Sequence, residues 1–128
     1  MKTESTRCGM RMLLILTILL ISGCAHNDPW TTRDTVMQVG VTTILAYDAV
    51  TTSRIQYVDG VYEKGPVAKV FLGSQPSTSD TYMYFGTLII SNYLISRALP
   101  AKWRPYWQVG SVAHNAYSVY GNCKLELC

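Results

Sequence analysis

Proline and glycine residues punctuate this 128-residue chain after residue 57, and they limit how long each helix can be. Asp59-Gly60 ends one segment with helical periodicity, Pro100 ends a second, and Pro105 suits the first position of a third. The connection between the first two segments is rich in Gly, Pro and Ser and is long for a loop without structure of its own. This punctuation predicts three main helices, over about residues 32–57, 79–99 and 105–120.

Side-chain periodicity agrees with these helices. The first segment has an apolar stripe at helical spacing, made of Met37, Val41, Ile44, Leu45, Thr52 and Ile55. Capping boxes begin the first two helices, Thr31 with Asp34 in one and Ser77 with Asp80 in the other. The second helix is apolar on nearly every side, which is typical of a helix central to a bundle or in lipid. Only 16 uncharged residues separate Asp80 from Arg97, however, and a membrane span needs about 20.

The long connection between the first two helices contains one further structural signal. Residues 67–72 follow Pro66 and precede Gly73, which predicts a short helical turn. A strand is the alternative, because Val67, Val70 and Phe71 also suit one.

Residues 1–23 have the parts of an export signal. Lys2, Arg7 and Arg11 give a positive start, and the ten residues from Met12 to Ile21 are apolar apart from Thr17. So short a run does not anchor a chain stably across a bilayer, but it fits the apolar region of a signal peptide. The alternative is an uncleaved anchor helix. The expected fold is therefore all-α: a three-helix bundle with a long structured loop between helices one and two, preceded by a signal-peptide helix.

The sequence Ile21-Ser22-Gly23-Cys24 resembles the lipobox of bacterial lipoproteins, which is an aliphatic residue, two small residues and a cysteine. The resemblance implies that diacylglycerol is attached to the Cys24 sulfur, that the chain is cleaved before Cys24, and that fatty acids such as palmitate anchor the product. Ala25 stands where an Asp resembles the inner-membrane retention signal of Gram-negative bacteria. Ala25 in place of that Asp implies an outer-membrane protein facing the periplasm, with the inner membrane as the alternative.

The remaining chain divides into a tether (24–30), a helical domain (31–122) and a C-terminal tail (123–128). The full chain has 11 Lys and Arg against 8 Asp and Glu; the signal contains three of the first and one of the second, so the product carries eight against seven. With no basic patch, the sequence gives no support for nucleic-acid binding. All nine tyrosines follow Cys24, and tyrosine suits surfaces that are half buried and half wet, membrane interfaces included.

Cys123 and Cys128 are the two cysteines left in the tail after processing and acylation. Export favours a disulfide between them, and two free thiols on a frayed tail are the alternative. A zinc site is not favoured, because two thiols have no histidine nearby.

Asp48 is the polar residue whose position is most informative, because it lies on the apolar stripe of the first helix. A carboxylate there needs partners, or its pKa must rise. Asn92 and Asn115 fall near the middle of the second and third helices. We expect Asp48, Asn92 and Asn115 to meet at one level as a buried polar cluster.

The sequence contains no motif that declares a reaction. His114 is a lone helical histidine, which is more often structural than catalytic. No serine-nucleophile motif, paired-histidine motif or phosphate-binding glycine loop is present, so no metal or cofactor is expected. Nothing in the spacing places Asp48 beside Glu63 as an acid–base pair.

A second resemblance involves the stripe and the loop. Asp48 with Thr52, then Tyr62-Glu63-Lys64-Gly65-Pro66, then Gly73-Ser74-Gln75-Pro76-Ser77, resembles a family of small uncharacterised helical bacterial and phage proteins. In that family an Asp is followed by a Thr, a Glu-x-Asn-Pro turn and a Gly-x-x-Pro-Ser step; this chain has Gly65 in place of Asn. The resemblance implies a membrane-associated helical bundle without known activity. It also implies that Glu63 and Pro66 shape the loop and that Asp48 accepts hydrogen bonds from that loop's backbone.

These patterns predict a lipid-anchored cell-envelope lipoprotein with a non-catalytic structural or partner-binding role. Its partners would be membrane lipid, through acylated Cys24, and another envelope protein. Trp103, Tyr106 and Trp107 suit the headgroup level of a membrane or, equally, a packed core. Two alternatives stay open: an integral inner-membrane helical protein with a functional intramembrane Asp48, and a small envelope enzyme using Asp48, Glu63 and His114.

Overall fold

A computed structural model describes residues 28–128, and every regular element in that range is helical. The elements are α2 (Thr32–Ser53), the 3₁₀ helix η1 (Arg54–Tyr57), α3 (Pro66–Leu72), α4 (Thr78–Ala98) and α5 (Arg104–Lys124). The expected all-α class is confirmed, and the segment after Pro66 is a helix and not a strand. The predicted signal, Cys24 and the tether as far as residue 27 lie outside the described residues.

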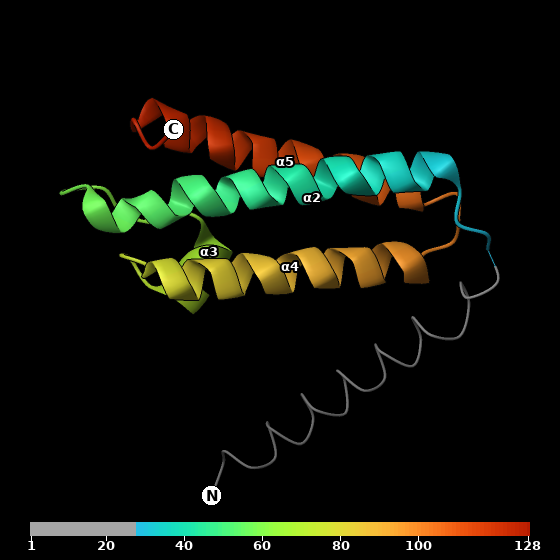
Figure 1. Cartoon of the computed structure of the whole chain (residues 1–128), viewed down its shortest axis with the longest axis horizontal. Coiled ribbons are helices and arrows are strands. Elements are labelled where there is room, and N and C mark those ends of the chain that lie inside the picture. Colours follow the sequence, from blue (N-terminus) through green and yellow to red (C-terminus); the bar gives the residue numbers. More distant parts are fainter. Residues whose placement is uncertain (1–27) are drawn as a thin grey trace, which may run out of the picture.

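The three long helices form a bundle with α2 in the middle. Figure 1 shows α2 between α5 and α4, with α2 and α5 running in the same direction and α4 running back. α2 packs closely on both neighbours, whereas α4 and α5 contact each other little. The apolar sequence of α4 is typical of a helix central to a bundle or in lipid, and the central place in this bundle belongs to α2. The buried residues of α4 are only Thr81, Phe85, Asn92 and Ser96.

The helix starts follow from their capping residues. At α2 the Asp34 amide donates to Thr31 Oγ1 (3.2 Å) and the Thr31 amide donates to Asp34 Oδ2 (2.9 Å), which completes the capping box. At α4 the Asp80 amide donates to Ser77 Oγ (3.1 Å). There the Asp80 carboxylate accepts from the Ser77 hydroxyl (2.7 Å). Side-chain caps thus fix where both helices begin.

The apolar core is small and lies where α2 faces α4. Its buried members are Val41, Leu45, Ala49 and Phe85, with Tyr84, Leu88, Ile89 and Val112 packed against them. Seven hydrophobic residues are buried in the described chain, against eleven polar or charged ones. Because most buried side chains are polar, the interior depends on hydrogen bonds as well as on apolar packing.

The C-terminal segment differs from the prediction. α5 does not end at Tyr120: it continues through Gly121 and Asn122 to Lys124. The left-handed residue beyond the helix is Glu126 (φ 62°), and the chain then turns back so that the Leu127 amide donates to Asn122 O (3.1 Å). The expected tail is thus partly helical, and Leu127 is only 1 % exposed. Asn122 continues the helix because its side chain has acceptors on α2.

No helix within residues 28–128 combines the length and the apolar character that crossing a bilayer requires.

Candidate functional site

Arg104 fastens the first described residues to one end of the bundle, where α2 and α5 begin and α4 ends. Its guanidinium donates to Asp28 O (3.0 Å), to Pro29 O (2.8 Å) and to Leu99 O (2.9 Å). Asp28 Oδ2 in turn accepts from the Ala101 amide (2.8 Å). We call these contacts the Arg104 clamp. They hold the last residues of the tether directly against the bundle.

The clamp includes a buried ion pair. Arg104 Nη1 lies 3.4 Å from Asp34 Oδ2, and the two side chains are 1 % and 2 % exposed. Burial raises the pKa of Asp34, but hydrogen bonds from the backbone and side chain of Thr31 and the charge of Arg104 outweigh it, so this pKa lies below its usual value. The guanidinium groups of Arg97 and Arg104 make cation–π contacts with the Trp30 ring, with their Cζ atoms 5.0 Å and 5.5 Å from its centroid.

Side-chain amides continue from the clamp across all three long helices. Gln108 Nε2 donates to Asp34 O (3.1 Å) and to Gln38 Oε1 (3.2 Å). Gln38 Nε2 donates to Asn92 Oδ1 (3.3 Å), and Asn92 Nδ2 donates to Ser111 Oγ (2.8 Å). This amide chain fixes the register of α2, α4 and α5, since a slip of any helix leaves buried amides unpaired. Even so, Asp34 Oδ1 and Gln108 Oε1 are buried without a partner within residues 28–128.

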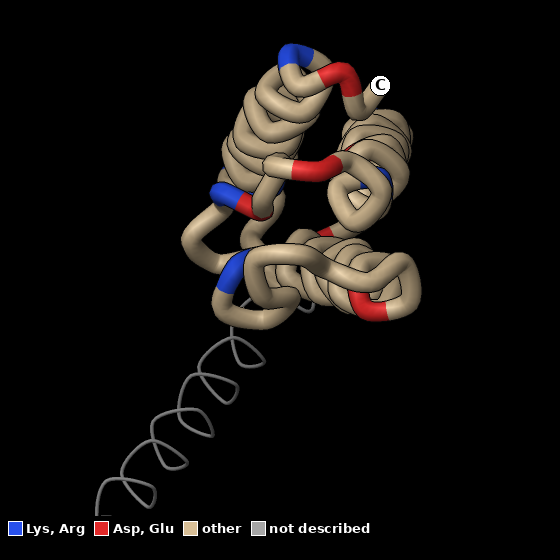
Figure 2. Tube along the Cα trace, turned by 90° about the vertical axis from the view of Figure 1, so that its left-hand side faces the viewer, with Lys and Arg blue, Asp and Glu red and all other residues tan. Residues whose placement is uncertain are grey.

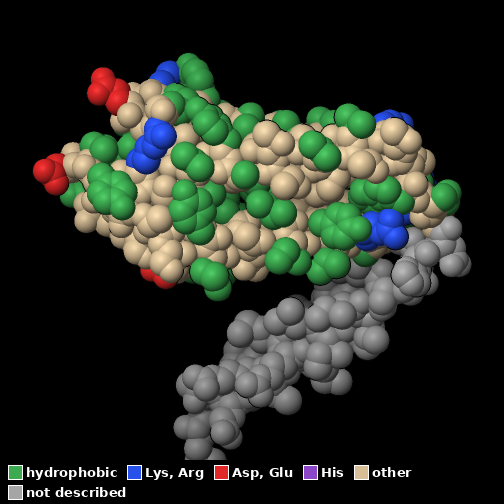
Figure 3. Space-filling view, in the orientation of Figure 1, with side chains coloured by type: hydrophobic (Ala, Val, Ile, Leu, Met, Phe, Trp, Pro, Cys, Tyr) green, Lys and Arg blue, Asp and Glu red, His purple; other side chains and the backbone are tan. Residues whose placement is uncertain are grey.

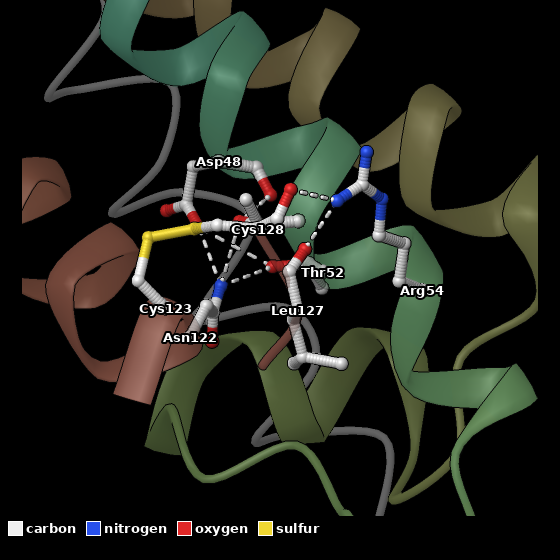
Figure 4. The surroundings of a disulfide bond; sticks show 8 residues. Asp48, Thr52, Arg54, Asn122, Cys123, Leu127 and Cys128 are labelled. Carbon is white, nitrogen blue, oxygen red and sulfur yellow. Dashed lines mark hydrogen bonds between the residues drawn. A yellow bond between two sulfur atoms is a disulfide. The ribbon is translucent and has the colours of Figure 1, made fainter. Parts of the chain in front are cut away.

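A second polar group, the Asp48 cluster, lies near the opposite end of the bundle, where α2 and α5 end. Figure 4 shows Asp48, Thr52 and Asn122 of this cluster. Asn122 Nδ2 donates to Asp48 Oδ1 (3.2 Å), Thr51 Oγ1 (2.9 Å) and Thr52 Oγ1 (3.2 Å). The Thr52 hydroxyl also donates to Asp48 Oδ1 (3.2 Å). Each partner of this carboxyl is therefore neutral.

The environment of Asp48 favours its protonated form. Its side chain is buried, and the residue is 4 % exposed. Burial raises the pKa of Asp48 to about 6, against the lowering effect of the Thr52 hydrogen bond, and the charge of Glu63 raises it further. Asp48 therefore changes charge slightly below neutral pH.

The C-terminus closes the bundle over the Asp48 cluster. Cys123 and Cys128 are joined in a disulfide, with their Cα atoms 4.8 Å apart. The loop that they close carries the buried Leu127, whose carbonyl accepts from Arg54 Nη1 (2.8 Å); Arg54 Nη1 also donates to Cys128 O. Figure 4 shows the disulfide, Arg54 and Asn122 around the same region. We call this arrangement the C-terminal latch.

The predicted cluster of Asp48, Asn92 and Asn115 does not form. α2 and α4 run in opposite directions, and Asp48 lies five residues before the end of α2 while Asn92 lies six before the end of α4. The two side chains are therefore toward opposite ends of the bundle. Asn92 belongs to the amide chain, and Asn115 is half buried and donates to Ser111 O of its own helix (2.7 Å). The partner of Asp48 is Asn122, which sequence reasoning missed.

Glu63 lies in the part of the loop between η1 and α3. The Gly65 amide donates to Glu63 Oε1 (2.6 Å), and the Glu63 amide donates to Ser74 O (2.9 Å), so Glu63 ties both sides of the loop together. Pro66 is the first residue of α3. The expectation that Asp48 accepts from the loop backbone is wrong, because Thr52 and Asn122 are its hydrogen-bond donors.

His114 does not join the carboxylates. It is exposed, and it precedes Asn122 by eight residues, or about 12 Å along α5. Glu63 lies close enough to Asp48 for its charge to influence the pKa, but its Oε1 accepts from Gly65. No group of three or more His, Cys, Asp or Glu side chains within residues 28–128 is arranged to hold a metal ion.

The aromatic side chains beside the clamp are exposed and do not form a packed core. Trp103 is 55 % exposed, Tyr106 72 % and Trp107 37 %. The rings of Trp103 and Tyr106 lie 5.9 Å apart, and Lys102 Nζ is 6.0 Å from the Trp103 ring. These side chains are therefore available for contacts outside the chain.

Comparison of the chain with protein-family models, with curated proteins and with solved structures gives no significant match.

Proposed function

We propose that this chain is a lipid-anchored cell-envelope lipoprotein, attached through acylated Cys24 to the outer membrane on its periplasmic side, with a non-catalytic structural or partner-binding role. The lipobox-like sequence Ile21-Ser22-Gly23-Cys24 motivates the anchor. The observation that carries the proposal is the Arg104 clamp, because it holds Asp28, only four residues beyond Cys24, and Pro29 against the bundle.

This short separation limits where the bundle can go. Four residue steps span at most about 14 Å when fully extended. An acylated Cys24 would therefore keep the clamped end of the bundle within that distance of the headgroups. A flexible linker would let the domain move far from its anchor, and the clamp removes that freedom at Asp28.

A non-catalytic role is supported by the way the polar side chains are used. Asp48 is occupied by Thr52 and Asn122, and Glu63 by the loop amide of Gly65. A partner-binding role is supported by the exposed apolar side chains of α3 and α4, namely Val67, Val70, Phe71, Met83, Ile90 and Leu94. Figure 3 shows hydrophobic side chains spread over the visible face of the bundle.

The test is the intact mass of the protein purified from the envelope of an expressing Gram-negative host. The proposal predicts a chain that begins at Cys24 and carries acyl mass, and incorporation of labelled palmitate. Cys24→Ala should abolish both and should let alkaline carbonate release the protein. Cys8→Ala is the matched control, because Cys8 lies in the predicted signal and its loss should change nothing.

Two results oppose the proposal. A wild-type chain that retains residues 1–23 and has no acyl mass would overturn the anchor. A Cys24→Ala chain that has lost its signal and still resists carbonate would favour the integral-membrane alternative.

A further inference from the structure

The two ends of the bundle carry different surfaces. Within residues 28–128, the exposed basic residues beside the Arg104 clamp are Arg33, Arg97 and Lys102, and the one exposed carboxylate there is Asp28. Asp34 and Arg104 at the same end are buried and neutralise each other. Figure 3 shows only Lys or Arg among the charged side chains visible at this end.

The opposite end carries acidic and basic residues in equal number. Asp59, Asp80 and Glu126 are exposed there and Glu63 is half buried; Figure 2, which looks onto this end, shows the acidic positions facing the viewer. Four basic residues, Arg54, Lys64, Lys69 and Lys124, share that end. Among the described residues, the basic excess is therefore confined to the clamped end.

The clamped end also carries the exposed Trp103 and Tyr106. Tyr and Trp, whose rings carry a polar group that can stay in contact with water, together with Lys and Arg are typical of protein surfaces at the headgroup level of a bilayer. We call Arg33, Arg97, Lys102, Trp103 and Tyr106 the basic aromatic end. Each of these five residues is exposed; Trp103 is the N-cap of α5, and Tyr106 lies in its first turn.

We propose that the basic aromatic end rests on an anionic phospholipid surface, so that the bundle stands on the membrane with its opposite end, which has no excess of basic residues, pointing away. This proposal rests on the proposed lipid anchor, which would bring the clamped end within reach of the headgroups. Two observations favour an anionic membrane as the partner of this surface. The exposed basic residues complement anionic headgroups, and the tether joins the bundle at this same end.

The orientation has a measurable consequence. α4 is 21 residues long, so its two ends are about 30 Å apart. Lys102 follows the last turn of α4, and Lys69 lies in α3, which packs near the start of α4. On a seated bundle, residue 102 is at the headgroups and residue 69 is farther away than the roughly 8 Å over which surface charge acts.

The experiment uses the full processed protein reconstituted in vesicles of phosphatidylethanolamine and phosphatidylglycerol. Lys102→Cys and Lys69→Cys each carry a fluorescent label; both positions are exposed lysines, which makes them a matched pair. The proposal predicts strong quenching of the label at residue 102 by headgroup-labelled lipid, and quenching of the label at residue 69 only at the background level. Equal quenching of the two labels would overturn it.

Charge variants test which surface is recognised. With a label at Tyr106→Cys, Arg33→Glu with Lys102→Glu should lower quenching to the level seen in purely zwitterionic vesicles. Each basic charge removed should reduce the ratio of seated to unseated molecules by about fivefold. Lys64→Glu with Lys124→Glu, at the other end, is the matched control and should have no effect. Equal quenching in anionic and zwitterionic vesicles, unchanged by Arg33→Glu with Lys102→Glu, would also contradict the proposal.

Two independent measurements distinguish a failure of this proposal from a failure of the proposed lipid anchor. Acyl mass on the reconstituted sample reports on Cys24, whereas the label pair reports on the seat. A chain found unprocessed, with residues 12–21 still attached, is reconstituted and measured in the same way.

Discussion

The two ends of the bundle bury a carboxyl group in opposite ways. Asp34 has Arg104 beside it, accepts hydrogen bonds from Thr31, and has a lowered pKa. Asp48 has only neutral donors, and burial raises its pKa to about 6. The difference shows that in this small core a buried charge is kept ionised only where a cation is buried with it. The clamped end is held by charge, whereas the latched end holds a group that can lose its charge.

The two carboxyl groups therefore give stability opposite dependences on pH. Asp34 has a folded-state pKa below 3.8, so its contribution is present above that pH and is lost as pH falls through the folded pKa. Asp48 binds its proton more tightly in the folded chain than in the unfolded chain, where the value is 3.8. Ionised Asp48 therefore destabilises the fold above pH 6, by an amount on the order of 3 kcal/mol, and this cost disappears as pH falls from 6 to 4.

Arg104→Ala should cause the largest loss of unfolding free energy among these variants. It removes the clamp and leaves Asp34 buried without its cation, which typically costs about 3–5 kcal/mol. Urea unfolding at pH 7 measures the loss. Arg97→Ala removes an exposed cation of the same end and should cost below about 1 kcal/mol. Similar losses for the two variants would show that the buried ion pair does not hold this end.

Asp48→Asn should stabilise the protein at neutral pH, by about 2–3 kcal/mol. The amide oxygen can still accept from Thr52 and Asn122, and the cost of the buried charge is gone. Urea unfolding from pH 4 to pH 8 should also lose the stability rise that wild type shows below pH 6. Asp59→Asn, at an exposed position of the same end, serves as the control. A neutral-pH stability below that of wild type would contradict the account.

Replacing both Cys123 and Cys128 by Ser should lower stability by about 2 kcal/mol, the value for a short closed loop. The effect should be confined to the latched end, so the pKa of Asp34 should not change. Thermal unfolding with and without a reductant checks this expectation: reduction should destabilise wild type and leave the double variant unaffected. An insensitive wild type would mean that Leu127 stays buried without the disulfide.

Glu63→Gln should produce the smallest change. Removing its negative charge should lower the pKa of Asp48 slightly from about 6, because Glu63 is a secondary cause of the rise after burial. The Gln oxygen can keep the hydrogen bond from the Gly65 amide, which preserves the loop. Carboxyl NMR signals measure the shift, with the exposed Glu126→Gln as the control. An unchanged or raised pKa would remove Glu63 from the explanation.

The fold was largely predictable from local chemistry. Thr31, Pro66 and Pro100 act within one turn of themselves, so the beginnings of α2 and α3 and the end of α4 follow from the sequence. The end of α5 did not follow. Gly121 is a strong stop signal, but Asn122 finds acceptors on α2 and the disulfide holds the following turn.

The site was less predictable, because its pairings depend on helix direction and register. Asp48 was identified as a buried carboxyl, yet its partner follows from the parallel course of α2 and α5 and not from its place along the chain. Arg104 directly precedes Pro105, and nothing in the neighbouring sequence indicates that its side chain is buried beside Asp34. The sequence did contain a weak indication that Asp34 and Gln38 are buried. Together with Val41 they follow helical spacing, with steps of four and three residues along one side of α2.

The central claim is that one end of the bundle is closed by a buried ion pair beside the tether, whereas the other holds a carboxyl group with neutral partners only. Site-resolved carboxyl titration by NMR tests it most directly, with Asp34→Asn and Asp48→Asn used to assign the two signals. The account predicts a midpoint near pH 6 for Asp48 and below 3.8 for Asp34. Two midpoints that both lie below pH 4 would contradict it.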